Sequence, residues 1–396
     1  MIKPLRKFSF LFLLLLPFVG YCQLPIPKWV DHFGGSGDSK ATGMVVDKQS
    51  NVYVGGYFAG TVDFDPSAAG VKNLTSKGGY DIYMAKYKPD GTLIWAESFG
   101  GGLLDQVNSM GIDSNGNPTL IGQFQSSDLV VGATTLQTVS ADDASTSREL
   151  KPVGATTLQT VSADDIFIIH LNTNGGVLWA KSIGGSDIDR GEQVNADVQG
   201  NIIATAIFQS TITVGGNTLT ASGGFDGLIA KYDASGNLIW DINLGSASGD
   251  TEVFGNGTDS NGNILISGSY TGQVDFDPLG AHKNSTSNGA NMPFLAKYTA
   301  AGKLIWINYL GGNLASNQTE LSIDANNDIV LTGSFSSNLT FNGATTLNAA
   351  GQDNFVAKYT ANGNFIFAKD LKTTGAGIFN YQVKTDAVNN IYIAGY

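Results

Sequence analysis

The sequence predicts an all-β protein, a β-propeller built from repeated four-stranded blades. The first observation is a stretch that recurs along the chain, DIYMAKYKPDGTLIWAESFGG at Asp81–Gly101, which is typical of two apolar strands joined by a Pro-Asp-Gly turn. The second is a repeat period of 62–66 residues, enough for four short strands. The third is a composition with 51 glycines and only 14% charged residues, as in turn-rich β proteins.

Two recurring hairpins define the blade. Versions of the first return at Asp165–Gly185, Asp226–Gly245, Met292–Gly312 and Asp353–Leu371. The second, built around a polar turn, occurs at Ala41–Phe58, Val107–Phe124, Val194–Phe208, Gly255–Tyr270, Leu321–Phe335 and Val383–Tyr396. Each blade is therefore expected to hold strands a and b from the polar-turn hairpin, followed by strands c and d from the other. Strand c carries apolar residues on both faces, as in Ile82–Ala85, so we expect it to pack between neighbouring blades.

The repeat period can be measured from a small residue that occurs once in each strand b. These residues are Gly56, Gly122, Ala206, Gly268, Gly333 and Gly395, and the intervals between them are 66, 84, 62, 65 and 62 residues. The long interval comes from a duplication. VGATTLQTVSADD stands at Val131–Asp143 and again at Val153–Asp165, an offset of 22 residues, and removing one copy restores 62. We therefore expect segment 131–165 to carry a 22-residue duplicated surface loop, with the bridge Ala144–Pro152 outside the blade.

Residues 1–22 are predicted to be a secretory signal peptide. A basic start precedes an apolar run, Phe8–Val19, that is too short to span a bilayer. Gly20 and Cys22 are the small residues expected before a cut at Gln23, and the alternative is a lipoprotein acylated at Cys22. Cys22 is the only cysteine, so the cut leaves a mature chain without disulfides. We therefore expect the protein to be secreted or held at the cell surface.

The charge of the chain excludes some partners. The net charge is −12, and removal of Lys3, Arg6 and Lys7 with the signal makes it −15. A surface this acidic disfavours nucleic acid and anionic lipid. No later apolar run is long enough for a transmembrane segment.

Residues 23–396 are predicted to form one propeller domain with five full repeat copies and a partial sixth. The sequence stops at Tyr396 inside strand b of the sixth copy, and Lys28–Phe33, with Trp29 where Trp95 stands, matches an isolated strand d. A first and a last segment usually complete one blade and close the ring. Because strand c of that blade is missing, we expect an open seam near both termini and a parent chain that is longer.

At this level of detail the repeats resemble a known family. The units WAESFGG, MGIDSNGNPTLIG and DIYMAKYKPDG look like the SBBP family, the seven-bladed β-propeller repeat of exported bacterial proteins. The resemblance covers nearly everything after the signal and implies a secreted or surface propeller, often one module of a longer chain with a C-terminal sorting or adhesion module. The chain departs from the family's name because it shows fewer than seven copies, and no such module is visible in it.

A binding site is expected on the face that carries the long b–c connections and the d–a links. Alternating strand direction places these together, opposite the short turns, and variable loops on a rigid scaffold usually carry function. The predicted d–a links contribute acidic residues: Asp38, Asp105, Asp187, Asp189, Glu192, Asp250, Glu252 and Glu320. The b–c connections GTVDFDP and GQVDFDP add Asp63, Asp65, Asp275 and Asp277.

The paired aspartates of the two DFDP connections have two interpretations. Carboxylates two residues apart could hold Ca²⁺, and Asp63, Asp65, Asp275 and Asp277 are the predicted ligands. The other interpretation is that these side chains accept hydrogen bonds from the loop backbone and order glycine-rich turns. No complete calcium-loop spacing is present, so the sequence favours the turn role and leaves the calcium site as a hypothesis.

The other recurring polar and aromatic residues favour structural roles. The tryptophans Trp95, Trp179, Trp240 and Trp306 recur at one position of strand d, which predicts packing between blades. His170 stands where other copies have lysine, and the three histidines are too far apart in the sequence to suggest a zinc site or a Ser–His–Asp triad. Neither a phosphate-binding loop nor any other cofactor site is indicated.

These features predict a non-enzymatic scaffold that binds an extracellular glycan or protein, or mediates adhesion, through its long-loop face. The alternative is a carbohydrate-active enzyme, a glycosidase or lyase, which would need two carboxylates at working separation in one pocket. A third possibility is a purely structural spacer with a flat loop face.

Overall fold

The computed structural model describes residues 34–67, 70–132, 156–158, 164–287, 289, 291–343, 345–349, 351–372 and 382–394. This part of the chain contains strands and turns but no helix, as the sequence predicts, and so offers no helix that could cross a membrane. The predicted signal peptide, the strand around Trp29 and the bridge Ala144–Pro152 lie outside the described residues.

Five antiparallel sheets of the predicted type follow one another along the chain. Sheet 1 contains, in strand order, β2 (Ser39–Val46), β3 (Val52–Phe58), β6 (Asp81–Tyr87) and β7 (Leu93–Phe99), and sheet 2 contains β8 (Asp105–Ile112), β9 (Pro118–Phe124), β12 (Asp165–Leu171) and β13 (Val177–Ile183). Sheet 3 contains β14 (Asp189–Ala196), β15 (Ile202–Phe208), β18 (Asp226–Tyr232) and β19 (Leu238–Leu244). Sheet 4 contains β20 (Thr251–Thr258), β21 (Ile264–Tyr270), β24 (Met292–Tyr298) and β25 (Leu304–Tyr309). Sheet 5 contains β26 (Gly311–Ile323), β27 (Ile329–Phe341), β29 (Asp353–Tyr359) and β30 (Phe365–Leu371). A two-stranded sixth sheet, β31 (Gln382–Thr385) and β32 (Ile391–Ala394), ends the described chain.

The b–c connection of each four-stranded sheet forms a small hairpin of its own. Four of these hairpins are β4 (Thr61–Asp63) with β5 (Asn73–Thr75), β10 (Leu129–Val131) with β11 (Thr156–Leu158), β16 (Thr211–Val214) with β17 (Asn217–Thr220), and β22 (Gln273–Asp275) with β23 (Asn284–Thr286). In sheet 5 the far end of β27 pairs with β28 (Thr345–Asn348), and in sheet 1 the short β1 (Gly34–Gly35) adds to β4. Because strands alternate in direction, these connection hairpins project from the end opposite the a–b and c–d turns.

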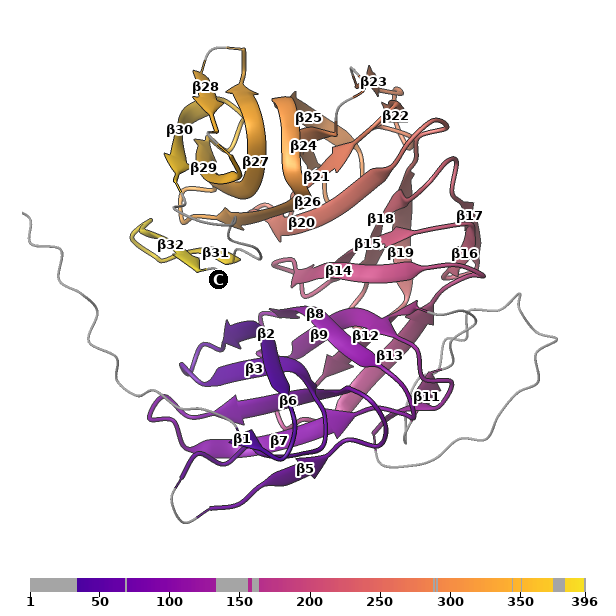
Figure 1. The fold of residues 1–396 in the computed structure, drawn as a ribbon, viewed down its shortest axis with the longest axis vertical. Coiled ribbons are helices and arrows are strands. Elements are labelled where there is room, and N and C mark those ends of the chain that lie inside the picture. Colours follow the sequence, from indigo (N-terminus) through magenta and orange to yellow (C-terminus); the bar gives the residue numbers. More distant parts are fainter. Residues whose placement is uncertain are drawn as a thin grey trace, which may run out of the picture.

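The sheets are arranged around their first strands. β2 contacts β8, β8 contacts β14, β14 contacts β20, β20 contacts β26, and β26 contacts β31. Figure 1 shows the sheets following one another from sheet 1 (indigo) to sheet 5 (orange), with β31 and β32 (yellow) next in line. Inner first strands and outer fourth strands are the arrangement of a propeller-type repeat fold.

The core lies between successive sheets. Every residue of the third strands β6, β12 and β18 is buried, which confirms the expectation that strand c packs on both faces. One apolar cluster joins Tyr53 and Met84 of sheet 1 to Met110 and Phe167 of sheet 2, and similar clusters join each later pair of sheets. Apolar burial between neighbours, rather than within one sheet, therefore stabilises the fold.

Tryptophans of the fourth strands link each sheet to the next, as the sequence predicted. The indole Nε1–H of Trp95 donates to the carbonyl oxygen of Thr173 at 3.1 Å, and Trp179 and Trp240 donate to Ala234 and Ala300 at 3.2 and 3.1 Å. Each acceptor lies in the c–d turn of the following sheet. The turn glycine beside it, such as Gly175 next to Trp95, lies so close to the indole ring that a side chain there would touch it.

Sheet 1 and the sixth sheet each expose a face that is buried elsewhere. Met44 of β2 is 61% exposed, whereas its equivalents toward the preceding sheet, such as Met110 and Leu321, are 6% and 3% exposed. Tyr392 of β32 is 55% exposed, whereas its equivalent Tyr53 is 0% exposed. The predicted open seam would lie between these two faces, and whether the ring closes there stays a prediction.

We expect the contact between turn glycine and tryptophan to stabilise the fold measurably. Gly236 (φ +84°) and Gly200 (φ +83°) both have left-handed backbones, but a Cβ at Gly236 would lie 2.9 Å from Cγ of Trp179, and one at Gly200 would touch nothing within 4 Å. Gly200→Ala should lower the free energy of unfolding by about 1–2 kcal/mol from backbone strain alone. Gly236→Ala should lose about 1–3 kcal/mol more from the clash. Urea denaturation measures the free energy of unfolding of both variants. Equal losses in Gly200→Ala and Gly236→Ala would contradict a stabilising role of the contact with Trp179.

Candidate functional site

The first predicted calcium loop connects β4 to β5 in sheet 1. Oδ1 of Asp63 accepts hydrogen bonds from the backbone N–H groups of Asp65 and Lys72, at 3.0 and 2.8 Å. Oδ1 of Asp65 accepts one from the N–H of Ser67 at 3.0 Å. Both carboxylates therefore order the backbone of the connection.

The second loop, between β22 and β23 in sheet 4, repeats this pattern. Oδ1 of Asp275 accepts from the N–H groups of Asp277 and Lys283, at 3.0 and 2.8 Å, and Oδ2 of Asp277 accepts from Ala281 at 2.9 Å. Nδ1 of the exposed His282 lies 2.6 Å from Oδ2 of Asp275. Burial acts to raise the pKa of Asp275, but the hydrogen bonds from His282 and the backbone hold it below its ordinary value.

The geometry supports the turn role of these aspartates. Each accepts the backbone hydrogen bonds expected of an Asx-type turn. The two loops belong to separate sheets, and the described part of the chain contains no group of three acidic, histidine or cysteine residues placed to hold a metal. The calcium hypothesis for Asp63, Asp65, Asp275 and Asp277 stays a prediction.

Calcium titration tests that hypothesis. An ion held only by the folded chain must raise the melting temperature, so millimolar calcium should raise it if the loops bind the ion. The rise should be lost in the double variant Asp63→Asn/Asp275→Asn. A melting temperature that does not respond to calcium would contradict the metal site and leave the turn role alone.

The acidic residues predicted to lie in the d–a links separate into three groups. Asp38, Asp187 and Asp250 are exposed link residues, as expected. Asp105 and Asp189 are instead the buried first residues of β8 and β14. The three glutamates lie within first strands: Glu192 in β14, Glu252 in β20 and Glu320 in β26. The link assignment was therefore wrong for the last two groups, because the first strands begin earlier than the sequence pattern indicated.

The buried aspartates order the glycine pairs at the strand exits. Oδ2 of Asp105 accepts from the N–H of Gly101 and from the hydroxyl of Ser126, both at 2.9 Å. Oδ2 of Asp189 accepts from the N–H of Gly185 at 2.7 Å. Burial raises the pKa of Asp189 to about 8, against the lowering effect of these hydrogen bonds. The carboxylates of Asp105 and Asp189 therefore have a structural role.

The glutamates form a central acidic cluster, which we define as Glu192, Glu252 and Glu320 on the first strands of sheets 3, 4 and 5. The amide Nε2 of Gln193, next to Glu192 in β14, donates to Oε2 of Glu320 at 2.7 Å. That bond joins sheet 3 to sheet 5 past the first strand of sheet 4. Nδ2 of Asn195 also donates to the carbonyl and side-chain oxygens of Asn256 in β20, at 2.8 and 2.9 Å.

Burial raises the pKa of two members of the central acidic cluster toward neutral pH. It raises the pKa of Glu192 to about 8, with repulsion from Glu252 and Glu320 adding to the effect and Arg190 opposing it. It raises the pKa of Glu320 to about 7, against the attraction of Lys384 and the hydrogen bond from Gln193. Near neutral pH these groups therefore hold protons that an exposed glutamate would have lost, so they can donate hydrogen bonds or a proton.

The pH dependence of stability should report this cluster. Glu192 and Glu320 ionise near pH 4.5 when unfolded but keep their protons to about pH 8 and 7 when folded. The folded state binds more protons in that interval, so the free energy of unfolding falls as the pH rises through it. Glu192→Gln/Glu320→Gln should reduce the loss of melting temperature between about pH 5 and 8. The control Glu97→Gln, at an exposed site, should leave the slope unchanged; an unaltered slope in the double variant would contradict the assignment.

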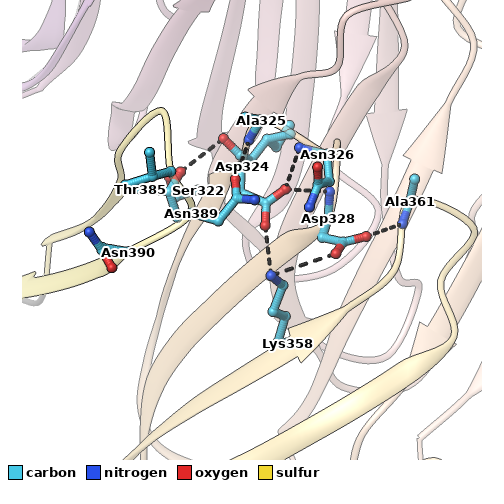
Figure 2. Close-up of polar contacts among 12 residues, drawn as sticks. Ser322, Asp324, Ala325, Asn326, Asp328, Lys358, Ala361, Thr385, Asn389 and Asn390 are labelled. Carbon is cyan, nitrogen blue, oxygen red and sulfur yellow. Dashed lines mark hydrogen bonds and ion pairs between the residues drawn. The ribbon is translucent and has the colours of Figure 1, made fainter. Parts of the chain in front are cut away.

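The a–b turns carry the recurring Asp–Lys clusters of the fold. Figure 2 shows the example in sheet 5, where Asp324 accepts hydrogen bonds from the backbone of Asn326 and Asp328 and pairs with Nζ of Lys358 at 2.7 Å. The same turn reaches the sixth sheet, because the N–H of Ala325 donates to Oδ1 of Asn389 at 3.0 Å. Equivalent ion pairs join Lys86 to Asp47, Lys231 to Asp197 and Lys297 to Asp259.

His170 replaces the lysine of this cluster in sheet 2, as the sequence indicated. It is buried, and its Nδ1 lies 2.8 Å from the hydroxyl of Thr119. Burial lowers its pKa to about 4, so the ring is neutral at physiological pH. Its neighbours give it a packing role. His282 is the exposed partner of Asp275, and His32 lies outside the described residues.

Sequence reasoning missed the central acidic cluster. One cause is that the sequence pattern began these first strands too late. Another is a β-bulge in the first strands β2, β8, β14 and β20, which in β14 falls between Gly191 and Gln193. A bulge places two consecutive side chains where a regular strand would place one, so simple alternation gives the wrong face for Glu192 and Gln193. Acidic residues in three consecutive repeats were the only available signal.

Comparison with known proteins shows likeness to another repeat protein. The chain is 24% identical over 393 residues to the uncharacterized WD repeat-containing protein L264 of Acanthamoeba polyphaga mimivirus; the match covers 86% of this chain but only 28% of that protein. No family model matches the chain, so its resemblance to the SBBP family stays a prediction.

Two solved structures also align with the chain. One is a protein of unknown function from Bacteroides caccae, at 8% identity over 74% of this chain and 92% of that one, with a TM-score of 0.34. The other is virginiamycin B lyase from Staphylococcus aureus, at 10% identity over 92% and 96% of the two chains, also with a TM-score of 0.34. Neither score is high enough to support an argument about function.

Proposed function

We propose that the protein is an exported propeller scaffold that binds an extracellular glycan or protein, without catalysis, through the face that carries the connection hairpins. The observation that carries this proposal is that recurring and variable polar groups lie in different parts of the fold. The groups that recur in every repeat hold sheets and turns together, whereas the connection hairpins differ from sheet to sheet and project into solvent.

The connection hairpins offer neutral hydrogen-bonding groups. Exposed hydroxyls pair across three of them: Oγ1 of Thr61 lies 2.8 Å from that of Thr75, Oγ1 of Thr211 lies 3.1 Å from that of Thr220, and Oγ1 of Thr340 lies 3.0 Å from that of Thr346. Hydroxyl groups both donate and accept, as the hydroxyls of sugars and the backbone of peptides do. A rigid scaffold that displays such groups suits a glycan or a protein loop better than a nucleic acid, given the net charge of −12.

The proposed scaffold has six or more blades, of which five are complete in this chain and β31 and β32 belong to a sixth. The exposed faces of Met44 and Tyr392 support a missing contact of the ordinary inter-sheet kind. The likeness to a WD repeat-containing protein supports a repeat scaffold of this type. Export rests on the predicted signal peptide.

An enzyme is the second candidate, favoured by the central acidic cluster alone. A carboxyl group whose pKa is about 8 or 7 can act as a general acid near neutral pH, as a glycosidase or lyase requires. Turnover of a polysaccharide that disappears in Glu192→Gln and Glu320→Gln would support this candidate over the scaffold.

The scaffold proposal is tested by screening the exported chain against arrays of extracellular glycans and proteins. We expect saturable binding without product formation. The double variants Thr61→Ala/Thr75→Ala and Thr211→Ala/Thr220→Ala should weaken binding at the responsible hairpin at least about tenfold, because they remove solvent-facing hydroxyls. Thr92→Ala, in a c–d turn at the opposite end, is the control. The control should bind as the unchanged chain does. If both double variants also bind as strongly, the ligand does not bind at the proposed face.

A further inference from the structure

At three of the four contacts between complete sheets, a lysine of the third strand bridges the two sheets with its ammonium group. Nζ of Lys231 lies 2.9 Å from Oδ2 of Asp197 in its own sheet and donates to the carbonyl oxygen of Ala300, in the c–d turn of sheet 4, at 3.1 Å. The same bridge runs from Asp47 through Lys86 to Thr173 and from Asp259 through Lys297 to Ala361. One ammonium group thus neutralises a buried carboxylate and also holds the next sheet.

The contact between sheets 2 and 3 has the two oxygen atoms of this bridge but not its lysine. Asp113 is 6% exposed, and its Oδ2 accepts a hydrogen bond from Nδ2 of Asn117 at 3.1 Å. The carbonyl oxygen of Ala234 accepts one from the indole of Trp179 at 3.2 Å. At the contact between sheets 3 and 4, the equivalent atoms each accept a further bond from the lysine. Within the described chain, the oxygen atoms of Asp113 and Ala234 therefore keep a lone pair for one more partner.

His170 stands at the lysine position of sheet 2 but does not form the bridge. Its Nδ1 lies 2.8 Å from the hydroxyl of Thr119, and its ring packs against Trp179 with 5.2 Å between the ring centroids. In the part of the chain that the structure describes, His170 forms neither an ion pair nor a hydrogen bond with Asp113. The imidazole is turned toward Thr119 and leaves the carboxylate without a counter-charge.

Two other lysines at this contact have different partners. Nζ of Lys181 in β13 lies over the rings of Tyr232 and Trp179, 5.2 and 5.8 Å from their centroids. Nζ of the exposed Lys48 donates to the carbonyl oxygen of Ser114 at 2.7 Å. Neither lysine forms an ion pair with Asp113 in the described ranges. A buried carboxylate without a cation is costly, so the fold gains stability if a cation from solution binds there.

The oxygen ligands specify the kind of cation. A carboxylate oxygen and a backbone carbonyl oxygen are hard ligands, which suit alkali and alkaline-earth ions better than transition metals. The site has a single negative charge to balance, which favours a monovalent ion. The equivalent oxygen atoms at the other contacts hold an ammonium group, and potassium, which is close to ammonium in size, exchanges its hydration shell for carbonyl oxygen atoms in proteins.

We propose that a potassium ion binds between sheets 2 and 3, with Oδ2 of Asp113 and the carbonyl oxygen of Ala234 among its ligands. The ion takes the structural role that the lysine ammonium group has at the other three contacts, and it couples the a–b turn of sheet 2 to the c–d turn of sheet 3. This end of the sheets lies opposite the connection hairpins, so the site is independent of the proposed function.

The test compares the melting temperature of the full chain in potassium chloride and in choline chloride of equal concentration, at about pH 8, where an ordinary histidine is neutral. Choline is too large for a buried site of this kind. We expect potassium to raise the melting temperature saturably by about 1–3 °C, because the ion binds the folded state alone. Ammonium chloride should act like potassium chloride, because the equivalent sites hold an ammonium group. Equal melting temperatures in potassium and choline would overturn the proposal.

Matched variants locate the ion. His170→Lys supplies the missing ammonium group, so it should raise the melting temperature in choline and abolish the response to potassium. Asp113→Asn removes the charge that the ion balances and should abolish the response as well, without placing a longer side chain in the core. The control is His282→Lys, the same substitution at an exposed histidine, which should leave the response unchanged. A potassium response that persists in Asp113→Asn would overturn the proposal, because the ion would then bind elsewhere.

Discussion

The contact between a fourth-strand tryptophan and the c–d turn of the next sheet is the interaction on which the arrangement depends. Trp95, Trp179 and Trp240 each place an indole ring against a turn glycine and donate a hydrogen bond to a carbonyl of the same turn. One side chain thus sets both the distance and the register between neighbouring sheets. No sheet of this kind can bury its two faces alone, so stability comes from the sum of such neighbour contacts.

The Asp–Lys clusters act at the same end of the molecule and explain why a chain with so few charges keeps these. An aspartate such as Asp324 saturates the N–H groups of its own turn, and the lysine of the third strand neutralises it. Removing one partner would leave a buried charge unpaired, which is far more costly than the pair is stabilising. The clusters therefore specify turn geometry and strand register rather than chemistry.

The opposite end of the sheets and the central first strands are where the repeats differ. The connection hairpins share a buried apolar residue, such as Val62 or Ile212, but vary in length and exposed side chains. The central acidic cluster exists in three sheets only, and burial moves the pKa of Glu192 and Glu320 to values at which they can exchange protons near neutral pH. A binding site at the connection hairpins would support the scaffold function, whereas a reaction at the central acidic cluster would support the enzyme.

The sequence by itself determined the repeat, the four-strand order and the buried strand c, because hydrophobic periodicity and turn residues are local signals repeated several times. It also determined the structural role of the tryptophans and of His170. The tryptophans recur at one position of strand d, and His170 stands at a position where the other repeats have lysine, so comparison between repeats indicates what each position does. Only the tertiary structure decided that Glu192, Glu252 and Glu320 belong to strands that meet at the centre and not to links. The physical reason is that a β-bulge shifts which side chains share a face, and that contacts such as Gln193 to Glu320 join residues 127 positions apart, whose proximity depends on how whole sheets pack.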